Sequence, residues 1–244
     1  MEKEKYTDIH CHVLPGVDDG ACDMQEALAL LRCAAAENVG KIILTPHQKP
    51  DRRCVSPEGM QRRMAELQKA ADQEKLGIRL YSGGELFYRQ GLEQELSEGK
   101  VCTLAGSRYV LVEFYPREQF EYIRNGIYSL LAAGYLPVLA HAERYEQVCR
   151  SREHLEELLG MGCYYQVNAG SLTGNFGWGM KRTAWGLVRE QMVSFVATDA
   201  HKPEGKRAAH MEHCARMLQK KCGENEAEKL LYGNAEKIFT DEEF

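Results

Sequence analysis

The feature that most restricts the fold of this chain is the regular alternation of short apolar runs with longer segments of helical periodicity. In residues 23–39, for example, Leu28, Leu31 and Ala35 recur at three- and four-residue steps, as on one face of a helix. Strands that alternate with helices pair in parallel through crossover connections, which predicts an α/β fold with an open doubly wound sheet or a barrel. The runs rich in β-branched and aromatic residues predict seven strands, at residues 6–10, 41–45, 78–83, 109–114, 136–141, 163–168 and 193–198.

Helical segments fill most of the intervals between these strands. Asp23 and Glu26 resemble a capping box at the start of the first helix. No internal repeat, low-complexity tract or linker rich in Gly, Ser or Pro interrupts the series, so residues 1–244 are expected to form a single domain. Further helices are predicted at residues 56–76, 122–134, 153–161 and 180–191, with a pair after residue 204.

Composition excludes several classes of protein. The formal net charge of -5 arises from acidic and basic residues mixed along the chain, without the basic stripe that binds nucleic acid. No run is long and apolar enough to span a bilayer, and the N-terminus lacks an apolar segment, so we expect a cytoplasmic protein without membrane insertion. The nine cysteines include no C-x-x-C pair, which is typical of free thiols in a reducing compartment.

Polar residues gather at the C-terminal ends of the predicted strands. In barrels of parallel strands the active site is built at that face from the ends of several strands, so the pattern predicts one shared site. Three other histidines, His154, His210 and His213, lie in helical segments and are expected to have ordinary core or surface roles. The strand-end residues are His10, His12, His47, Glu85, Glu113, His141, Asn168, Asp199 and His201.

The residue types at these strand ends are those of a metal site. His10 and His12 are separated by one residue, and on an extended strand such residues point to the same side, so both imidazoles can bind one ion. The set contains more histidines and carboxylates than one tetrahedral ion uses, and carboxylates can bridge two ions. A site with several metal ions is therefore predicted, and its mixed nitrogen and oxygen ligands suit manganese, iron or zinc.

Several segments are similar to a known group of metal-dependent phosphatases. The chain resembles the PHP (polymerase and histidinol phosphatase) superfamily in DIHCHVLPGVDDGA, TPH, GGELFY, SRYVLVEF, AHAERY, VNAGSLTGNFG and ATDAH. It resembles most closely the branch of bacterial manganese-dependent protein-tyrosine phosphatases that regulate capsule and exopolysaccharide synthesis, because of the DDGA turn and the NAGSLTGNFG stretch. The resemblance covers nearly the whole chain and implies a distorted, TIM-like (β/α) barrel of seven strands.

The resemblance also implies which residues bind the metal ions. Two or three ions are expected, with manganese as the metal and iron or zinc as alternatives. Asp18, next to Asp19, is the open alternative for one ligand. The implied sets are His10, His12 and Asp199 on the first ion with Glu85 bridging to the second, Glu113 and His141 on the second, and Asp19, His47 and His201 on the third.

The same resemblance implies a reaction and a substrate. Arg144, in the AHAERY motif, would contact the phosphate, and Arg144, His201 and Asp199 are the expected catalytic residues, with no general acid assigned. The implied reaction is hydrolysis of phosphotyrosine by a metal-activated hydroxide, in which the phenolate leaves readily because its parent acid has a pKa of about 10. The implied substrate is the phosphotyrosine-bearing tail of a membrane-associated bacterial tyrosine kinase that controls polysaccharide assembly.

Four other interpretations are left open by the sequence. A barrel of the amidohydrolase type also opens with His-x-His, but it usually has a modified lysine on the fourth strand, where this chain has Glu113. A histidinol-phosphate phosphatase, or another small-molecule phosphoesterase of the superfamily, would use the same metal ligands. Cys102 and Arg108 have the Cys-x5-Arg spacing of cysteine-dependent tyrosine phosphatases, but they lead into a strand rather than into a helix N-terminus. A non-catalytic scaffold that binds a kinase tail is expected to lack ligands, whereas all the expected ligands are present.

Two local features each have two interpretations. Lys206 and Arg207 both lie where a basic residue is expected after ATDAH. A group of aromatic residues that follow strand ends is predicted either to form the wall of a phosphotyrosine pocket or to pack beneath loops. Its members are Phe87, Tyr88, Phe114, Tyr115 and Tyr145.

Overall fold

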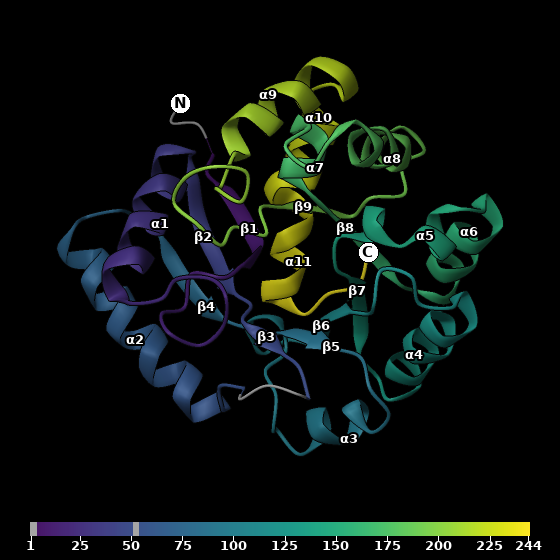
Figure 1. The fold of residues 1–244 in the computed structure, drawn as a ribbon, viewed down its shortest axis with the longest axis horizontal. Coiled ribbons are helices and arrows are strands. Elements are labelled where there is room, and N and C mark those ends of the chain that lie inside the picture. The colour runs from purple at the N-terminus through teal and green to yellow at the C-terminus, as the bar shows by residue number, and fades with distance from the viewer. Residues whose placement is uncertain (1–3, 51–53) are drawn as a thin grey trace.

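All the strand pairs in the described chain are parallel, and the strands curl round a common interior. The computed structural model describes residues 4–50 and 54–244. In Figure 1 the strands are arranged around α11 (Asn234–Thr240), which lies near the middle of the view, and most other helices lie outside them. The strands are β1 (Tyr6–Cys11), β2 (Val39–Leu44), β3 (His47–Gln48), β4 (Arg79–Ser82), β5 (Glu85–Phe87), β6 (Tyr109–Glu113), β7 (Leu136–Leu139), β8 (Tyr164–Asn168) and β9 (Phe195–Ala197).

Strand pairing differs from the single ring of seven strands expected from the sequence. Each of the seven predicted runs contains a strand, but the described residues form a three-stranded sheet, in the order β1-β2-β4, and a six-stranded sheet, in the order β3-β5-β6-β7-β8-β9. The predicted barrel count is therefore not confirmed, and the sheet is a curled parallel half-barrel. The two unpredicted strands, β3 and β5, follow breaks at Pro46 and at Gly83–Gly84. Proline cannot donate to a strand ladder and glycine weakens one, which explains both breaks.

The first and last strands lie side by side at their C-terminal ends. The backbone N–H of Asp199 donates to the carbonyl of His10 (2.8 Å), and the N–H of His12 donates to the carbonyl of Ala200 (2.9 Å). The register of β1 against β2 is irregular between Asp8 and Cys11, and such irregularities re-aim side chains near functional sites. The backbone thus places the His-x-His pair directly beside the Asp-Ala-His segment that follows β9.

The interior of the curled sheet is apolar at one end and polar at the other. Leu111 and Ala197 belong to a buried apolar cluster, and Ile238 of α11 packs into the same cluster. Because side chains alternate along a strand, the next residues on the same face are Glu113 and Asp199. Glu113 is the last residue of β6, and Asp199 follows the end of β9 by two residues, so the polar end is the edge at which these parallel strands finish.

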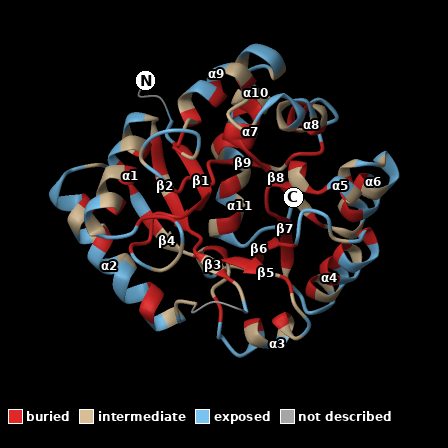
Figure 2. Ribbon diagram, viewed as in Figure 1, coloured by how far each residue is buried: buried red, intermediate tan, exposed pale blue. Residues whose placement is uncertain are grey.

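Helices cover the outside of the sheet, where Figure 2 shows exposed residues facing away from buried strands. The predicted cap of the first helix is confirmed, since Glu26 N–H donates to Asp23 (2.8 Å) and Cys22 N–H donates to Glu26 (2.7 Å). Three helices, α3, α5 and α7, are too short for the sequence to have predicted them. The helices besides α11 are α1 (Met24–Ala36), α2 (Pro57–Gln73), α3 (Leu92–Ser97), α4 (Phe120–Ala132), α5 (Glu146–Cys149), α6 (Arg152–Met161), α7 (Ala169–Thr173), α8 (Trp178–Arg189), α9 (Met211–Cys222) and α10 (Glu224–Glu228).

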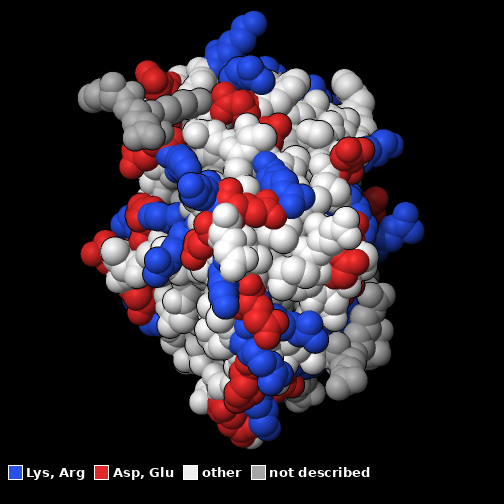
Figure 3. All heavy atoms as spheres, turned by 90° about the vertical axis from the view of Figure 1, so that its left-hand side faces the viewer, with Lys and Arg blue, Asp and Glu red and all other residues white. Residues whose placement is uncertain are grey.

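The molecular surface carries mixed charge on the face that lies at the left of Figure 1. In Figure 3 lysines and arginines interleave with aspartates and glutamates over that face. No helix within residues 4–50 and 54–244 combines the length and the apolarity needed to cross a membrane. All nine cysteines are free, as the sequence predicts.

Candidate metal centre

Glu85 lies at the centre of the polar end of the sheet. Its carboxylate, at the start of β5, is buried, and four imidazoles surround it, two from the end of β1, one from β3 and one from the segment after β7. His141 Nε2 lies 2.9 Å from Oε1, His10 Nε2 lies 3.4 Å from Oε1, and His12 Nε2 lies 3.3 Å from Oε2. His47 Nδ1 lies 2.7 Å from Oε2. The side chains of His10 and His12 point to the same side as predicted, with their Nε2 atoms 3.2 Å apart.

A second part of the cluster surrounds Asp19, in the loop after β1. Its Oδ1 lies 3.4 Å from His47 Nε2 and 3.5 Å from His201 Nε2. The rings of His201 and His12 stack with their centroids 3.8 Å apart, which joins this part of the cluster to the part around Glu85. Asp18, the alternative ligand, instead contacts His12 Nδ1 at 2.8 Å and accepts a hydrogen bond from the backbone N–H of His47 (3.1 Å). The arrangement therefore favours Asp19 as a ligand.

Asp199 completes the cluster from the segment after β9. Its Oδ1 lies 3.6 Å from His10 Nε2 and 3.5 Å from His12 Nε2. Its other oxygen, Oδ2, accepts hydrogen bonds from Arg144 Nη2 (2.8 Å) and Asn168 Nδ2 (2.9 Å). Asp199 has a φ of 52°, in the left-handed region that non-glycine residues rarely adopt. Backbone strain of this kind concentrates at functional sites.

Buried partners fix the outer nitrogens of the histidines. Asp18 faces Nδ1 of His12, and Gln166 Oε1 lies 3.0 Å from Nδ1 of His10. The same amide oxygen of Gln166 accepts a hydrogen bond from the backbone N–H of His141 (2.8 Å). Metal-ligating histidines usually bind such a partner through the nitrogen that does not face the metal, which sets the tautomer and the ring orientation. Gln166 was missed by the sequence analysis, although it shares a strand face with Asn168.

The donor set fits metal ions. Oε2 of Glu85 is buried, and within the described chain it accepts no hydrogen bond, although it points at two imidazole nitrogens. A buried carboxylate oxygen in this position needs a cation as its partner. Among residues 4–50 and 54–244, three groups have ligand atoms that all lie within 4.8 Å of one another: His12, Asp19, His47 and His201; His10, His12 and Glu85; and His47, Glu85 and Glu113.

This grouping differs in part from the sets implied by the family resemblance. All nine implied ligands lie in the one cluster, but His47 reaches Glu85 and Glu113 as well as Asp19. His141 faces Glu85 and does not join the group that contains Glu113. The difference arises because β3 and β5 pair with His47 directly opposite Glu85, a register that the sequence does not reveal.

When no metal is bound, protons on the histidine rings supply the positive charge that balances the carboxylates of the cluster. Burial would lower the pKa of His12, but the carboxylates of Asp18 and Glu85 outweigh burial and raise it to about 9. Burial opposes the charged form of His47 as well, yet Asp19, Glu113 and Glu85 raise its pKa to about 12. Burial would raise the pKa of Glu85, but the surrounding imidazoles, His10 first, hold it well below its usual range. The cluster therefore balances its carboxylates with imidazolium protons, which metal ions displace on binding.

Within the described residues, three cationic side chains lie at the rim of the cluster. Arg144 binds Asp199, as described above, and keeps part of its side chain exposed. Arg207 Nη1 lies 3.1 Å from Asp19 Oδ2 and its guanidinium also contacts His201, whereas Lys206 contacts no residue of the cluster. Lys49 Nζ lies 3.1 Å from Glu113. Of the two basic residues that the sequence offered after ATDAH, the structure places Arg207 at the site.

The predicted aromatic wall divides into two parts. Tyr88, Phe114 and Tyr145 are buried, and the Tyr145 hydroxyl accepts a hydrogen bond from the backbone of Phe114 (3.0 Å), so these three residues belong to the core. Phe87 and Tyr115 pack edge to face with ring centroids 4.6 Å apart, and Tyr115 is 64% exposed. Lys49 lies 5.8 Å from the Phe87 ring, which places this pair near Glu113.

The Cys-x5-Arg spacing does not form a phosphate-binding loop. Cys102 is half-buried, and burial raises the pKa of its thiol. A nucleophilic cysteine needs the opposite shift. Arg108 is occupied at the C-terminal end of the chain, where its guanidinium binds Asp241 and Glu243.

Fold and site together define an α/β protein with a candidate polynuclear metal centre at the C-terminal edge of a curled parallel sheet. The family described as capsular polysaccharide synthesis, CpsB/CapC, matches residues 6–240, and the chain belongs to this family. It is 31% identical to the tyrosine-protein phosphatase YwqE of Bacillus subtilis (strain 168), over 96% of this chain and 92% of that protein. It is also 34% identical to the putative tyrosine-protein phosphatase CapC of Staphylococcus aureus, over 80% of this chain and 76% of that protein.

Solved structures agree with the family assignment. A structure from a study of YwqE from Bacillus subtilis and CpsB from Streptococcus pneumoniae, described as unique metal-dependent tyrosine phosphatases, superposes with a TM-score of 0.91. The superposed chains are 30% identical, and the match covers 97% of this chain and 95% of that chain. The curled α/β architecture expected from the sequence is therefore shared with a characterised member of the family.

Proposed function

We propose that this protein is a metal-dependent protein-tyrosine phosphatase. The observation that carries the proposal is the buried Glu85 carboxylate, on which imidazoles from β1, β3 and the end of β7 converge beside an arginine at the rim. Characterised relatives in the same family are named tyrosine-protein phosphatases, which supports the substrate class. The proposal includes a single domain over residues 1–244. It also includes a distorted barrel of seven strands, in which β2 and β3 count as one interrupted strand and β4 and β5 count as another.

The cluster residues would hold two or three metal ions. We propose manganese, with iron or zinc as the alternatives, because mixed imidazole and carboxylate ligands suit all three. When bound, such ions lower the pKa of water and neutralise charge on phosphoryl oxygens. The proposed ligands are His10, His12, Asp19, His47, Glu85, Glu113, His141, Asp199 and His201.

The protein's own residues bind and orient the phosphate. Arg144 is held by Asp199 through one nitrogen, so its remaining donors are free to bind phosphoryl oxygens, the pairing for which a guanidinium is best suited. Arg207 and Lys49 add positive charge at other points of the rim. Phe87 and Tyr115 are placed to contact the phenyl ring of the substrate. A phenolate, with a parent pKa of about 10, leaves with little help from a proton donor.

The proposed substrate is the phosphotyrosine-bearing tail of a membrane-associated bacterial tyrosine kinase that controls capsular polysaccharide synthesis. The family description, capsular polysaccharide synthesis, supports this assignment. The proposed compartment is the cytoplasm, and the nine free cysteines are in keeping with such a reducing compartment. The exposed position of Tyr115 at the site leaves room for a polypeptide rather than only a small metabolite.

A competition between substrates tests the proposal. Manganese-reconstituted protein is given a tyrosine-phosphorylated peptide and histidinol phosphate at equal concentration, with and without chelator. We expect preference for the peptide and loss of activity with chelator. Preference for histidinol phosphate would instead make the protein a small-molecule phosphatase, and activity that persists after complete metal removal would refute the metal mechanism.

A further inference from the structure

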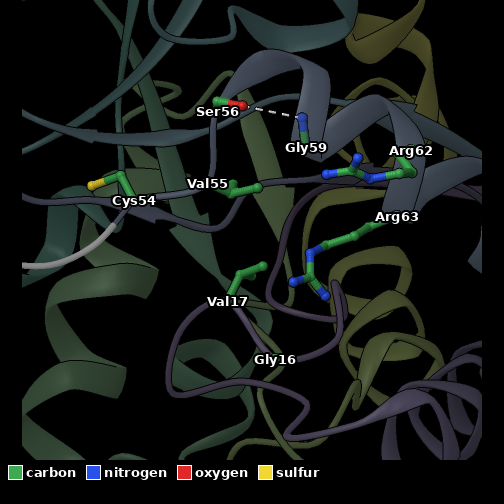
Figure 4. Close-up of a pocket in the computed structure, with 8 residues that line it drawn as sticks. All are labelled: Gly16, Val17, Cys54, Val55, Ser56, Gly59, Arg62 and Arg63. Atoms are coloured by element: carbon green, nitrogen blue, oxygen red, sulfur yellow. Dashed lines mark hydrogen bonds between the residues drawn. The ribbon is translucent and has the colours of Figure 1, made fainter.

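A pocket of about 400 Å³ lies between the loop after β1 and the beginning of α2. Figure 4 shows it in close-up, with the guanidinium groups of Arg62 and Arg63 directed toward the side on which Val17 and Val55 lie. Its described lining consists of Gly16, Val17, Cys54, Val55, Ser56, Gly59, Arg62 and Arg63, and none of these residues has a carboxylate. The pocket therefore concentrates positive charge in a chain whose net charge is -5.

The two arginines differ in how they are held. Arg63 Nη1 donates to the backbone carbonyl of Pro15 (3.1 Å), so part of its guanidinium supports the loop after β1. Arg62 makes no hydrogen bond or ion pair with any residue of the described chain. Among the other described lining residues, Ser56 and Cys54 have polar side chains, and the Ser56 hydroxyl accepts a hydrogen bond from the Gly59 N–H (3.2 Å). The guanidinium of Arg62 is thus the donor that the pocket leaves for a ligand.

Both walls of the pocket are continuous with the metal centre. Gly16 and Val17 lead directly into Asp18 and Asp19, and the Gly16 N–H donates to the Ala21 carbonyl (2.8 Å), which closes that loop tightly. On the opposite wall, the Val55 carbonyl accepts a hydrogen bond from Gln48 Nε2 (3.2 Å), and Gln48 is the neighbour of His47 on β3. A ligand in the pocket therefore lies beside the Asp19 and His47 part of the cluster.

We propose that this pocket binds an anionic side chain of the same polypeptide whose phosphotyrosine occupies the metal centre. The inference rests on the proposed function and adds a substrate preference to it. A guanidinium pairs with carboxylate and phosphoryl oxygens in the same bidentate manner, so the ligand is an acidic residue or a second phosphotyrosine near the scissile one. A substrate segment dense in phosphotyrosine or acidic residues is then preferred over one with neutral flanks.

Peptides that differ in one flanking residue test the inference. Each peptide contains one phosphotyrosine at a fixed position and one test residue, which is moved along either flank. The test residue is alanine, aspartate or a phosphotyrosine analogue in which a non-hydrolysable phosphonate replaces the phosphate. We expect the best anionic peptide to exceed the alanine peptide roughly fivefold in kcat/KM, the size that an exposed ion pair provides. The preference is expected to shrink as salt is added, because exposed charges are screened. Comparison of the aspartate peptides with the phosphonate peptides shows whether the pocket prefers an acidic residue or a second phosphotyrosine.

Two variants assign the preference to the pocket. Arg62→Gln is expected to reduce the ratio of kcat/KM for the anionic peptide to kcat/KM for the alanine peptide to about one. Because this is a ratio, any effect of the substitution that is common to both peptides cancels. Lys69→Gln makes a similar change of charge at an exposed position two turns along α2, outside the pocket, and is expected to keep the wild-type ratio. An unchanged ratio in Arg62→Gln, or equal rates on all peptides in the wild type, would overturn this inference alone. Failure to hydrolyse any phosphotyrosine peptide would overturn the proposed function itself.

Discussion

The two ends of the sheet interior are built from the same strands and differ in almost every physical property. At one end, Leu111, Ala197 and Ile238 form a dry apolar cluster that α11 closes. At the other end, a residue or two further along the strands, Glu113 and Asp199 enter a cluster of imidazoles and carboxylates. The apolar end gains its stability from burial and close packing. The polar end buries charge, which costs stability unless each group has a partner.

From this contrast we expect one set of residues to hold the fold and another to perform the proposed chemistry. Substitutions at the apolar end are expected to change the free energy of unfolding and leave the reaction of the folded protein alone. Substitutions at the polar end are expected to change metal binding and turnover. The following experiments test whether the division is this sharp.

The largest effect is expected from Asp199→Ala. The substitution removes a carboxylate that faces His10 and His12 and leaves Arg144 without its buried partner. Both the bound metal, measured by elemental analysis, and kcat/KM on a phosphotyrosine peptide are expected to fall, the latter by at least about 100-fold. Asp241→Ala, at an exposed site bound to Arg108, is the control. Wild-type metal content and activity in Asp199→Ala would refute the site assignment.

Ile238→Ala tests the apolar end. Ile238 is fully buried in the interior cluster, so its truncation is expected to lower the free energy of unfolding by about 2–5 kcal/mol, as measured by urea denaturation of the metal-free protein. Turnover per folded, metal-loaded molecule is expected to stay near the wild-type value. Ile238→Val, which removes one methylene, is expected to cost about 0.5–1.5 kcal/mol. A large loss of turnover at full folding would show that the two ends are coupled.

Gln166→Ala tests the supporting residues at the polar end. Gln166 contacts the outer nitrogen of His10 and the backbone N–H of His141. Without Gln166, the His10 ring and the segment that carries His141 are therefore less firmly oriented. Metal affinity, measured by titration with manganese, is expected to fall about 10- to 100-fold. Gln25→Ala, on the exposed face of α1, is the matched control. Equal affinities in the two variants would mean that Gln166 only fills space.

The pH dependence of the metal-free protein is expected to reflect the polar end. Because the pKa of His12 is raised to about 9 in the folded state, its contribution to stability is fully present below its unfolded pKa of about 6.5. That contribution is lost as the pH rises to 9. Glu85, whose pKa is lowered, contributes stability above its unfolded pKa of about 4.3, and this is lost as the pH falls below that value.

Thermal denaturation of the metal-free protein from pH 4 to 9 measures this dependence. We expect a maximum of stability between about pH 4.3 and 6.5, from the two unfolded pKa values. Saturating manganese is expected to raise the melting temperature most toward pH 9, because metal ligands must lose their protons. A metal-free protein whose stability keeps rising up to pH 9 would contradict the charge balance described for the cluster.

Much of this architecture could be predicted from local pattern. All seven predicted strands were found because runs such as residues 109–114 combine β-branched residues with clear boundaries. The strands β3 and β5 were missed because a segment of two or three residues carries no periodicity. The implied ligands came from the family resemblance, and the structure gathers all of them, but Gln166 gave no signal beyond its alternation with Asn168.

The sequence by itself determined which histidines and carboxylates stand at the ends of predicted strands, because residue type and alternation are local properties. The tertiary structure decided which of these residues face one another. It set His47 opposite Glu85 through the register of β3 and β5, turned Asp18 toward His12 and Asp19 toward His201, and brought Arg207 rather than Lys206 to the rim. These choices depend on contacts between segments that are distant in the chain, and pairing register and loop closure are fixed only when the whole sheet has curled.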